Sequence, residues 1–381
     1  MPITTNSPTA TELLAEMRAR TPQMIEQLGA FVNLESPSLN VDQLQRSAEY
    51  LAALFASVTG KAAQIIPSES GPHVHWKGSD ETKVLIVGHH DTVFPLGTTA
   101  TRPFSIDGDV ARGPGVFDMK AGIVQAIHGL SAIRDSYHVE MLITADEEVG
   151  SYASRELIEA RARATGAVLV LEPSADGGAL KIARKGVGTF TVQIAGRASH
   201  AGLEPEKGVN ALVELAAQVP KIVAMARPEL GTTVTPTVAT AGNAENVVPD
   251  AAMIKVDVRV VLPEEKDRIE REMSQLQTVV AGATLKVSGS VNRPPMHESA
   301  GRKLFGVAEK VAAELGIKNL QGVAVGGGSD GNFTAAIGVP TLDGMGAVGG
   351  GAHAVTEHVL VSQMAERAAL VAGIARAIVN A

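Results

Sequence analysis

The stretch KVLIVGHHD, residues 83–91, decides the fold class of this chain. Six mostly apolar residues are followed at once by two histidines and an aspartate. An apolar run without polar alternation is typical of a strand that is buried on both faces, as in parallel sheets covered by helices. The runs MLITA (141–145) and AVLVL (167–171) have the same character. Together they predict an α/β domain with a mostly parallel sheet and helices on both faces.

Segments with helical periodicity surround these strands. Residues 8–59 predict two amphipathic helices, and residues 119–134 and 151–164 predict one helix each between successive strands. A long Ala-rich helix is expected at about 360–380. Strands that alternate with helices in this way are expected to form one parallel sheet.

The pattern changes near Gly186, where a second set of elements begins. Their expected order is strand, helix, strand, strand, helix, strand, which is a ferredoxin-like βαββαβ unit. Its strands are expected at 189–196, 232–242, 252–261 and 283–291, and its helices at 209–227 and 264–281. We therefore expect one domain of residues 1–185 and 294–381, interrupted by an inserted domain of residues 186–293.

The composition argues against several classes of function. The net charge of −8 opposes a surface for nucleic acid or for an anionic membrane, so neither partner is expected. No basic segment followed by an apolar one opens the chain, and no uncharged apolar window of about 18 residues occurs, which predicts a cytoplasmic protein. Because the 381 residues include no Cys, a metal site would need His, Asp or Glu ligands.

Residues that can bind metals follow three of the predicted strands. In open α/β sheets, ligands bind beyond the carboxyl ends of the strands. His89 and Asp91 follow the first apolar run, the acidic triplet at 146–148 follows the second, and Glu172 follows the third. Three strands that deliver such residues to one edge suggest a metal site built from oxygen and imidazole ligands.

Two glycine-bracketed segments supply further candidates. GPGVFDMKAG (113–122) contains Asp118, and GGGAHAVTEH (349–358) contains His353. Taken alone, Asp118 is more typical of a helix N-cap, and His353 of an ordinary loop. Glu148 alone would be an acid at a helix start, where the macrodipole favours it. These structural interpretations weaken when the candidates are considered together.

Seven motifs lie along the chain in order: GHHDTVFP, GPGVFDMKAG, ADEEVGS, LEPS, GRASHAG, DVRV and GAHAVTE. With them, from about Lys83 to His358, the sequence resembles the co-catalytic di-zinc exopeptidase and deacylase family. Its members include glutamate carboxypeptidase (carboxypeptidase G), acetylornithine deacetylase, succinyl-diaminopimelate desuccinylase and aminoacylase. The runs GHHDTVFPLGT and GGGSDGNFTAAIGVPTLDG look most like the glutamate carboxypeptidase branch. The resemblance implies a catalytic zinc-binding domain with an inserted lid and dimerisation domain.

The resemblance implies two Zn²⁺ ions per chain. His89 and Glu172 would bind one ion, Glu148 and His353 would bind the other, and Asp118 would bridge them. Two such ions can share a hydroxide and polarise an amide carbonyl. Mn²⁺ and Co²⁺ stay open as alternatives, because oxygen and nitrogen ligands accept several metals.

The resemblance also implies roles for residues that do not bind metal. Asp91 would hold the imidazole of His89 in orientation, and Glu147 would be the general base that passes a proton to the leaving amine. His200, in the insert, would stabilise the oxyanion, often from the partner subunit of a dimer. Without the resemblance, His200 is equally a residue that caps a turn. A homodimer through the inserted domain is therefore expected.

Three residues of the insert are candidates for binding a small-molecule substrate. By resemblance, Arg259 would grip the α-carboxylate with its planar fork, although an Arg in DVRV alone is as consistent with a structural role. Asn246 and Arg293 are further candidates. A second basic residue would be needed to bind a glutamate side chain. The candidates are Lys181, Arg184 and Lys185, and the sequence does not select one of them.

The sequence thus predicts a metallopeptidase or amidohydrolase of the carboxypeptidase type. It would cleave the amide bond of an N-acyl amino acid or of a C-terminal residue, with glutamate favoured on the carboxyl side. Two alternatives stay open: a deacylase or desuccinylase of another N-acyl amino acid, and a catalytically silent relative kept as a binding or assembly module. The presence of all five ligands and the base weighs against silence.

Overall fold

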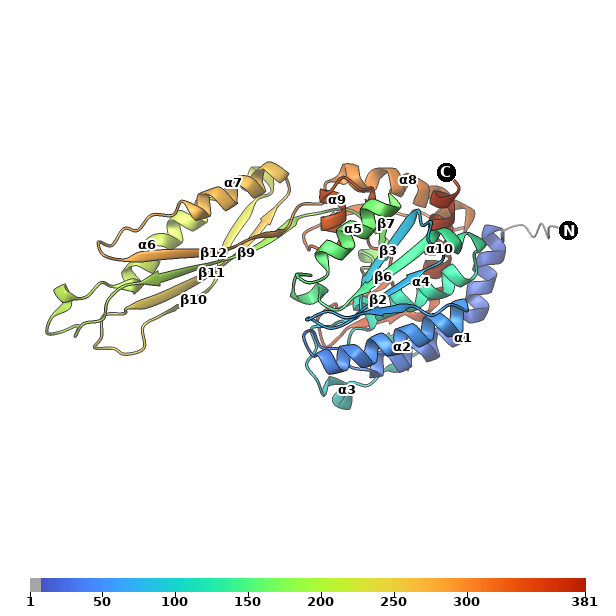
Figure 1. Ribbon diagram of the computed structural model, residues 1–381, viewed down its shortest axis with the longest axis horizontal. Helices are drawn as coiled ribbons and strands as arrows, with labels where there is room; N and C mark the ends of the chain where they lie inside the picture. The colour runs from blue at the N-terminus through green and yellow to red at the C-terminus, as the bar shows by residue number, and fades with distance from the viewer. Residues whose placement is uncertain (1–7) are drawn as a thin grey trace. The chain divides into compact units, whose positions relative to one another are not determined.

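A computed structural model describes residues 8–381 of the protein (Figure 1). The chain divides into two compact units. Unit 2 comprises Arg184–His297 together with Gly326–Gly328, and unit 1 comprises the other described residues. The division therefore begins at Arg184 rather than at 186 and ends at His297 rather than at 293.

Unit 1 is built around a six-stranded sheet. Four neighbouring strands of this sheet, β6, β3, β7 and β14, run parallel. The central strand β3 pairs in parallel with β6 on one side and with β7 on the other, and all residues of these three strands are buried. In spatial order the strands are β1 (Gln64–Ile66), β2 (His73–Lys77), β6 (Val139–Thr144), β3 (Val84–His89), β7 (Val168–Val170) and β14 (Thr341–Leu342). The continuous apolar runs thus form the parallel core of the sheet, as predicted.

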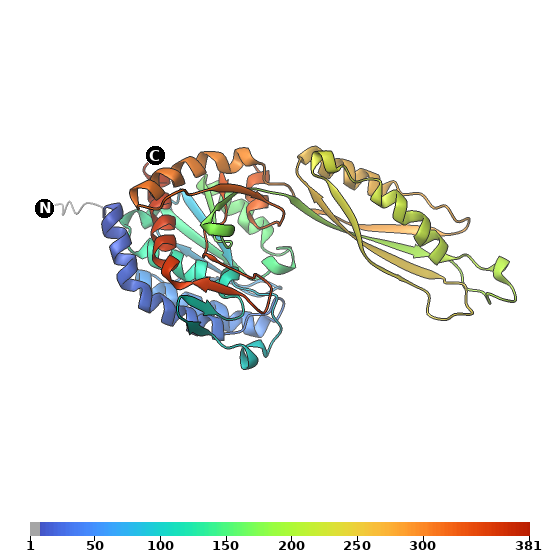
Figure 2. The same ribbon diagram turned by 180° about the vertical axis from the view of Figure 1, so that it is seen from behind.

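Helices cover both faces of this sheet, which confirms the predicted fold class. Val84 and Ile86 of β3 belong to a core shared with five of the helices, whereas Leu85 and Val87 belong to a separate core shared with α5. The C-terminal helix α10, red in Figure 2, contacts α1 and α4. The helices of unit 1 are α1 (Ala10–Asn33), α2 (Val41–Thr59), α3 (Thr98–Thr101), α4 (Ala121–Ser131), α5 (Arg155–Thr165), α8 (Glu298–Glu314), α9 (Gly331–Ala336) and α10 (Met364–Val379).

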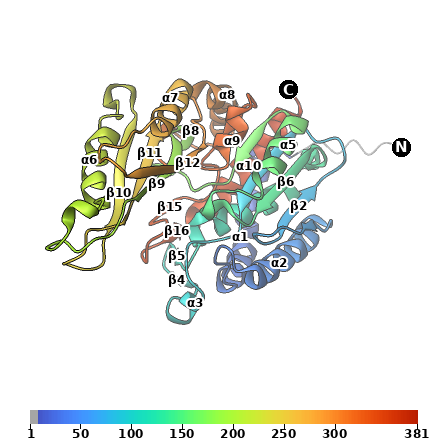
Figure 3. The same cartoon turned by 60° about the vertical axis from the view of Figure 1, so that its left-hand side comes forward.

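Smaller elements complete unit 1. A four-stranded sheet brings the segment around residue 358 against the segment around residue 112, two regions far apart in the sequence (Figure 3). Its strands are β15 (Gly349–Gly350), β16 (His358–Leu360), β5 (Val110–Arg112) and β4 (Ser105–Asp107), and a separate pair is formed by β8 (Leu180–Arg184) and β13 (Gly322–Val325). Short 3-10 or π turns in the two units lie at Val116–Lys120, Arg134–His138, Glu147–Val149, Asp176–Gly178, Pro205–Lys207, Pro228–Leu230 and Val361–Gln363.

Unit 2 is the predicted βαββαβ arrangement. Its antiparallel sheet has the order β10-β11-β9-β12, with two helices on one face (Figures 1 and 3). Alternate residues of β9, such as Phe190, Val192 and Ile194, face those helices in a core of their own. The elements are β9 (Gly186–Ala195), α6 (Ala211–Val223), β10 (Thr233–Ala241), β11 (Ala251–Val260), α7 (Pro263–Ser274) and β12 (Thr284–Arg293).

The helix expected at 264–281 is shorter than predicted, because α7 ends at Ser274. The following chain leaves the helix and is held by the fully buried carboxylate of Glu214 in α6. That carboxylate accepts hydrogen bonds from the backbone N–H groups of Val279 and Val280. A tertiary contact therefore holds the non-helical chain that follows this helix, and the local sequence does not reveal that contact. Within residues 8–381, no helix combines the length and apolarity needed to cross a membrane.

The close approach of α4 and α10 gives a test of the core of unit 1. A Cβ atom on Gly129 of α4 would lie 2.3 Å from the carbonyl oxygen of Ala368, whereas a Cβ atom on Gly306 of α8 would meet nothing within 4 Å. We expect Gly129→Ala to lower the free energy of unfolding by about 1–3 kcal/mol. We expect Gly306→Ala to be neutral or to raise it by about 0.5–1 kcal/mol. Urea unfolding of both variants checks this, and equal effects would contradict the helix packing.

Candidate metal centre

The candidate ligands of unit 1 lie where strands and turns end. His89 is the last residue of β3, and Glu172 lies two residues beyond the end of β7. Glu147 and Glu148 form the 3-10 turn that follows β6, and Asp118 lies in the turn Val116–Lys120. The N-cap of α4 is Lys120, so Asp118, whose backbone has φ −115° and ψ 91°, does not cap that helix.

The five predicted ligands come together around Asp118. The Nε2 atom of His89 lies 3.2 Å from Oδ1 of Asp118 and 3.7 Å from Oε1 of Glu172. The Nε2 atom of His353 lies 3.3 Å from Oδ2 of Asp118 and 3.2 Å from Oε2 of Glu148. Each oxygen of Asp118 thus faces a different imidazole. The geometry divides the ligands into His89 with Glu172 and His353 with Glu148, with Asp118 between the two pairs.

Glu147 also lies close to this cluster. Its carboxylate and ligand atoms of His89 and Glu172 all lie within 4.8 Å of one another, and so do ligand atoms of His89, Asp118 and Glu148. The first grouping allows Glu147 either to bind a metal or to stand beside it as a base. His353 is in neither grouping, but its short distances to Asp118 and Glu148 place it in the same cluster.

The electrostatics of the cluster call for added positive charge. Hydrogen bonds to Asp118 and Glu148 raise the pKa of His353 to about 10. Burial alone would lower the pKa of His89, but its bonds to Asp118, Asp91 and Glu172 raise it well above the ordinary value. Burial would raise the pKa of Asp118, yet the two imidazoles hold it below its usual range. The carboxylates therefore stabilise any cation placed among them.

The residues fit a pair of divalent metal ions. Four carboxylates surround two imidazoles, so negative charge remains even when both imidazoles are protonated. Burial raises the pKa of Glu148, and its Oε1 atom is buried without a hydrogen-bond partner among the described residues. An orphaned carboxylate oxygen is costly unless something pairs with it. Oxygen and imidazole ligands of this kind suit zinc, manganese or cobalt.

Asp91 connects two parts of the centre. It is fully buried, and its carboxylate lies 3.4 Å from Nδ1 of His89, whose ring also approaches the carbonyl of Asp91 at 3.0 Å. The same carboxylate accepts hydrogen bonds from the backbone N–H groups of Glu147 and Glu148, each at 3.2 Å. Asp91 therefore holds both an imidazole and the turn that carries the two adjacent acids.

Two buried acids near the centre were not singled out in the sequence. Asp330 accepts a hydrogen bond from the hydroxyl of Ser151, at the end of the acidic turn. Glu357 accepts bonds from three backbone N–H groups of the segment that ends in Asp118. Burial raises the pKa of Glu357 to about 7. Their places in GGGSDG and GAHAVTE, beside candidate ligands or glycines, were the only signals available.

The candidates in unit 2 lie at the two ends of its sheet. His200 is exposed and forms a bridge with Val247, and its Nδ1 atom accepts hydrogen bonds from the N–H groups of Gly202 and Leu203. Asn246 adjoins it, because its carbonyl accepts a bond from the N–H of Ala201. His200 therefore caps a turn, and Nε2 is left as the hydrogen-bond donor of the neutral ring.

The arginine candidates lie at the other end of the sheet. Arg259 and Arg293 are both in register with Val187 of β9, on strands to either side of it. The guanidinium of Arg259 already donates two hydrogen bonds to Asp257, at 2.9 and 3.0 Å. Arg293 is buried. Of the other candidate cations, Arg184 donates hydrogen bonds to the carbonyls of Gly327 and Gly328.

Fold and centre together define a metal-dependent hydrolase of the α/β type. A family model described as Peptidase family M20/M25/M40 matches residues 85–377, and the chain belongs to this family. The chain is 30% identical over 365 residues to carboxypeptidase G2 of Pseudomonas sp. (strain RS-16), which covers 91% of this chain and 87% of that protein. It is 29% identical over 320 residues to succinyl-diaminopimelate desuccinylase of Dinoroseobacter shibae, covering 76% and 82%.

Solved structures agree with the fold. The M20 family metallo-carboxypeptidase Sso-CP2 from Sulfolobus solfataricus has a TM-score of 0.75 at 16% identity, covering 94% of this chain and 100% of that chain. At this identity the likeness supports the fold alone. The family model and the identity to carboxypeptidase G2 confirm the predicted family, and the protein is a hydrolase of the peptidase and deacylase type.

The raised pKa of His353 makes metal affinity depend on pH. Below a pKa of about 10 the imidazole of the metal-free protein is protonated, and a metal must displace that proton. We expect Zn²⁺ affinity to rise from pH 6 to 8, by about tenfold per pH unit for each displaced proton. Titration calorimetry in two buffers with different ionisation enthalpies counts the protons released. His353→Gln should release fewer, and His358→Gln, five residues away, should match the wild type; equal release by all three would contradict this role.

Proposed function

We propose that the protein is a two-metal carboxypeptidase-like amidohydrolase that cleaves the amide bond of an N-acyl amino acid, with glutamate favoured on the carboxyl side. The observation that carries the proposal is the placement of Asp118 between two imidazole–carboxylate pairs. Such a ligand set suits two metal ions bridged by one carboxylate. The likeness to carboxypeptidase G2 supports the choice of substrate class.

The chemistry divides between the metals and the chain. When bound, the metals polarise the scissile carbonyl and lower the pKa of water. Glu147 is the base that takes a proton from the attacking water and gives it to the leaving amine. Asp91 supports this role, because its hydrogen bonds to the backbone of Glu147 and Glu148 fix where their side chains begin. The Oε2 atom of Glu148 lies 3.2 Å from Nε2 of His353, so Glu148 is assigned to the metal.

The insert supplies the substrate contacts in this proposal. The planar fork of Arg259 binds the α-carboxylate, with Asp257 holding the guanidinium in place through two hydrogen bonds. Arg293, in register with the same residue of β9, adds positive charge at this end of the sheet. The Nε2–H of His200 donates to the oxyanion, and Asn246 lies beside it.

The spacing within unit 2 supports a homodimer. The register places Arg259 against Val187 and Ala251 against Ala195, so eight residues of β9 separate the two ends of the sheet. At about 3.3 Å per residue this is roughly 26 Å, and His200 lies beyond Ala195. One small substrate cannot contact both His200 and Arg259 of the same chain. Two copies resolve this if the partner supplies the histidine.

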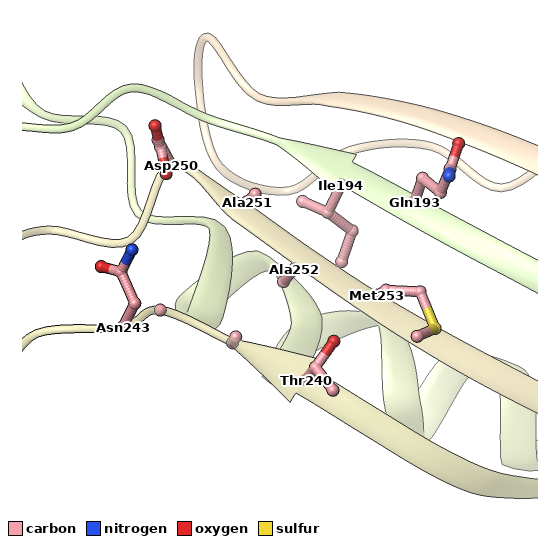
Figure 4. Close-up of a pocket in the computed structure, with 10 residues that line it drawn as sticks. Gln193, Ile194, Thr240, Asn243, Asp250, Ala251, Ala252 and Met253 are labelled. Atoms are coloured by element: carbon pink, nitrogen blue, oxygen red, sulfur yellow. The ribbon is translucent and has the colours of Figure 1, made fainter.

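The surface of unit 2 offers a place for such a partner. β10 is an edge strand, and Pro236 with the bulge that follows leaves residues 238–241 as the part able to pair with another strand. A depression of about 410 Å³ lies beside it, with Thr240, Asn243 and Met253 among its lining (Figure 4). A second depression, of about 550 Å³, adjoins the first and reaches Leu212 of α6, which is 47% exposed.

The base assignment is tested by Glu147→Gln. We expect the rate of hydrolysis of an N-acyl-glutamate to fall by about 10²–10⁴-fold, since the amide cannot accept the proton, while two metals remain bound. Glu148→Gln is the matched control at the neighbouring position and should lose metal. Activity assays with metal analysis of both proteins measure this. Loss of metal from the Glu147 variant would instead make Glu147 a ligand.

The second candidate function is a deacylase or desuccinylase of another N-acyl amino acid, which the likeness to the desuccinylase favours. A hydrolysis screen in which the acyl group and the carboxyl-side residue vary independently separates the two. Preference for glutamate at the carboxyl side supports the first function, and preference for a succinyl group supports the second. No hydrolysis of any substrate by metal-loaded protein would indicate a silent relative.

Mixing two inactive variants tests whether His200 acts in the partner's site. If it does, a dimer of one Glu147→Gln chain and one His200→Ala chain contains one intact site and one doubly defective site. We expect equal mixtures, after subunit exchange, to regain about a quarter of wild-type activity, because half of the dimers carry one working site of two. If His200 acts within its own chain, every site keeps one defect and the mixture stays inactive.

A further inference from the structure

Glu357 holds the backbone of the turn that carries Asp118. It lies four residues after His353 and its side chain is 1% exposed. Its Oε2 atom accepts a hydrogen bond from the N–H of Gly115 at 2.8 Å. Its Oε1 atom accepts bonds from the N–H groups of Phe117 and Asp118, both at 2.9 Å. Three backbone donors more than 230 residues away in sequence thus converge on one buried carboxylate.

The turn needs such a partner because it is not a regular helix. Gly115 has φ 72°, and Asp118 has extended rather than helical backbone angles. N–H groups in a turn of this kind lack the carbonyl partners that a helix provides, and burying them without acceptors is costly. A Cβ atom on Gly115 would lie 2.6 Å from the side chain of Thr92, so the segment also has little room to move.

We propose that Glu357 is a positioning residue for the bridging carboxylate of Asp118. By fixing the N–H of Asp118 itself, it sets the point from which the two oxygens of Asp118 reach His89 and His353. The same residue ties this turn to the segment that carries His353. His358, the residue after Glu357, pairs with Arg112 of β5 and connects the same two segments through their backbones.

The charge and shape of Glu357 both matter to this role. A carboxylate offers two acceptor oxygens for three donors, and charge-assisted bonds of this kind are stronger than neutral ones. A glutamine keeps one acceptor oxygen and turns an NH₂ group toward at least one of the three N–H groups. Glu357→Gln therefore removes at least one bond and sets two donors against each other, with almost no change in side-chain volume.

The inference rests on the proposed two-metal function, and metal binding itself tests it. We expect Glu357→Gln to weaken the binding of at least one Zn²⁺ by about ten- to hundredfold in competition with a chromophoric chelator. With saturating metal, kcat should fall while KM stays close to the wild-type value. Glu357→Asp, which keeps the charge and both oxygens, should recover part of the loss.

Glu140→Gln is the matched control. Glu140 is also fully buried in unit 1 and accepts three side-chain hydrogen bonds, from Arg161 at 2.8 and 2.6 Å and from Thr82 at 3.2 Å. It lies near the opposite end of β6 from the acidic turn, so its loss tests the removal of a buried carboxylate as such. We expect this variant to bind metal with wild-type affinity.

Hydrogen exchange gives a readout that does not require metal. Amide exchange in a peptide that covers residues 113–120 should be faster in metal-free Glu357→Gln than in the wild type, and unchanged in Glu140→Gln. Wild-type metal affinities in Glu357→Gln, or an equal loss in Glu140→Gln, would overturn the inference alone. A wild-type protein that binds no metal would overturn the proposed function instead. If Glu357→Gln does not fold, the same two measurements are made on Glu357→Asp, whose side chain is shorter. Wild-type Zn²⁺ affinity and wild-type amide exchange in Glu357→Asp would then overturn the inference.

Discussion

The centre depends on one constraint: four carboxylates must stay close together in a partly buried place where they repel one another. Asp118, Glu147, Glu148 and Glu172 surround two imidazoles, and the pKa of His353 rises to about 10 because of the acids beside it. Such a cluster persists only if the fold holds it or if cations compensate it. Both conditions shape the rest of the structure, from the strand ends that deliver the side chains to the turns that aim them.

The fold holds the cluster through a second group of buried acids, which accept hydrogen bonds from the backbone and are not candidate metal ligands. Asp91 accepts hydrogen bonds from backbone N–H groups of the turn with Glu147 and Glu148. Glu357 accepts hydrogen bonds from backbone N–H groups of the turn with Asp118. Asp146 contributes in the same manner, since its side chain accepts the N–H of Ala153. Each ligand-bearing turn is irregular and would otherwise leave buried N–H groups unpaired. The acids that satisfy these groups therefore also determine where the ligands point.

Much of this architecture was predictable because it follows from local patterns. Continuous apolar runs indicate parallel strands, and residues just beyond such runs meet at one edge of a sheet, which brings His89, Glu148 and Glu172 together. The positions of Asp118 and His353 needed the family motifs, since neither follows a strand of the large sheet. Long-range contacts could not be predicted from the sequence. Glu214 holds residues 279 and 280, beyond the end of α7, and Glu357 reaches the turn that begins near residue 115, and neither contact has a local signal in the sequence.

The two adjacent acids at 147 and 148 show how one turn can serve two purposes. In a regular strand they would point to opposite faces, and in this 3-10 turn they diverge toward different partners. Glu148 faces His353, whereas Glu147 lies near His89 and Glu172. A catalytic zinc site keeps three protein ligands and one open position. In the proposed site, one imidazole nitrogen from His89 and carboxylate oxygens from Glu172 and the shared Asp118 would supply three ligand atoms, so the carboxylate of Glu147 would not be needed to complete the set. Because it lies close to His89 and Glu172 without being required as a ligand, it would be suited to moving a proton.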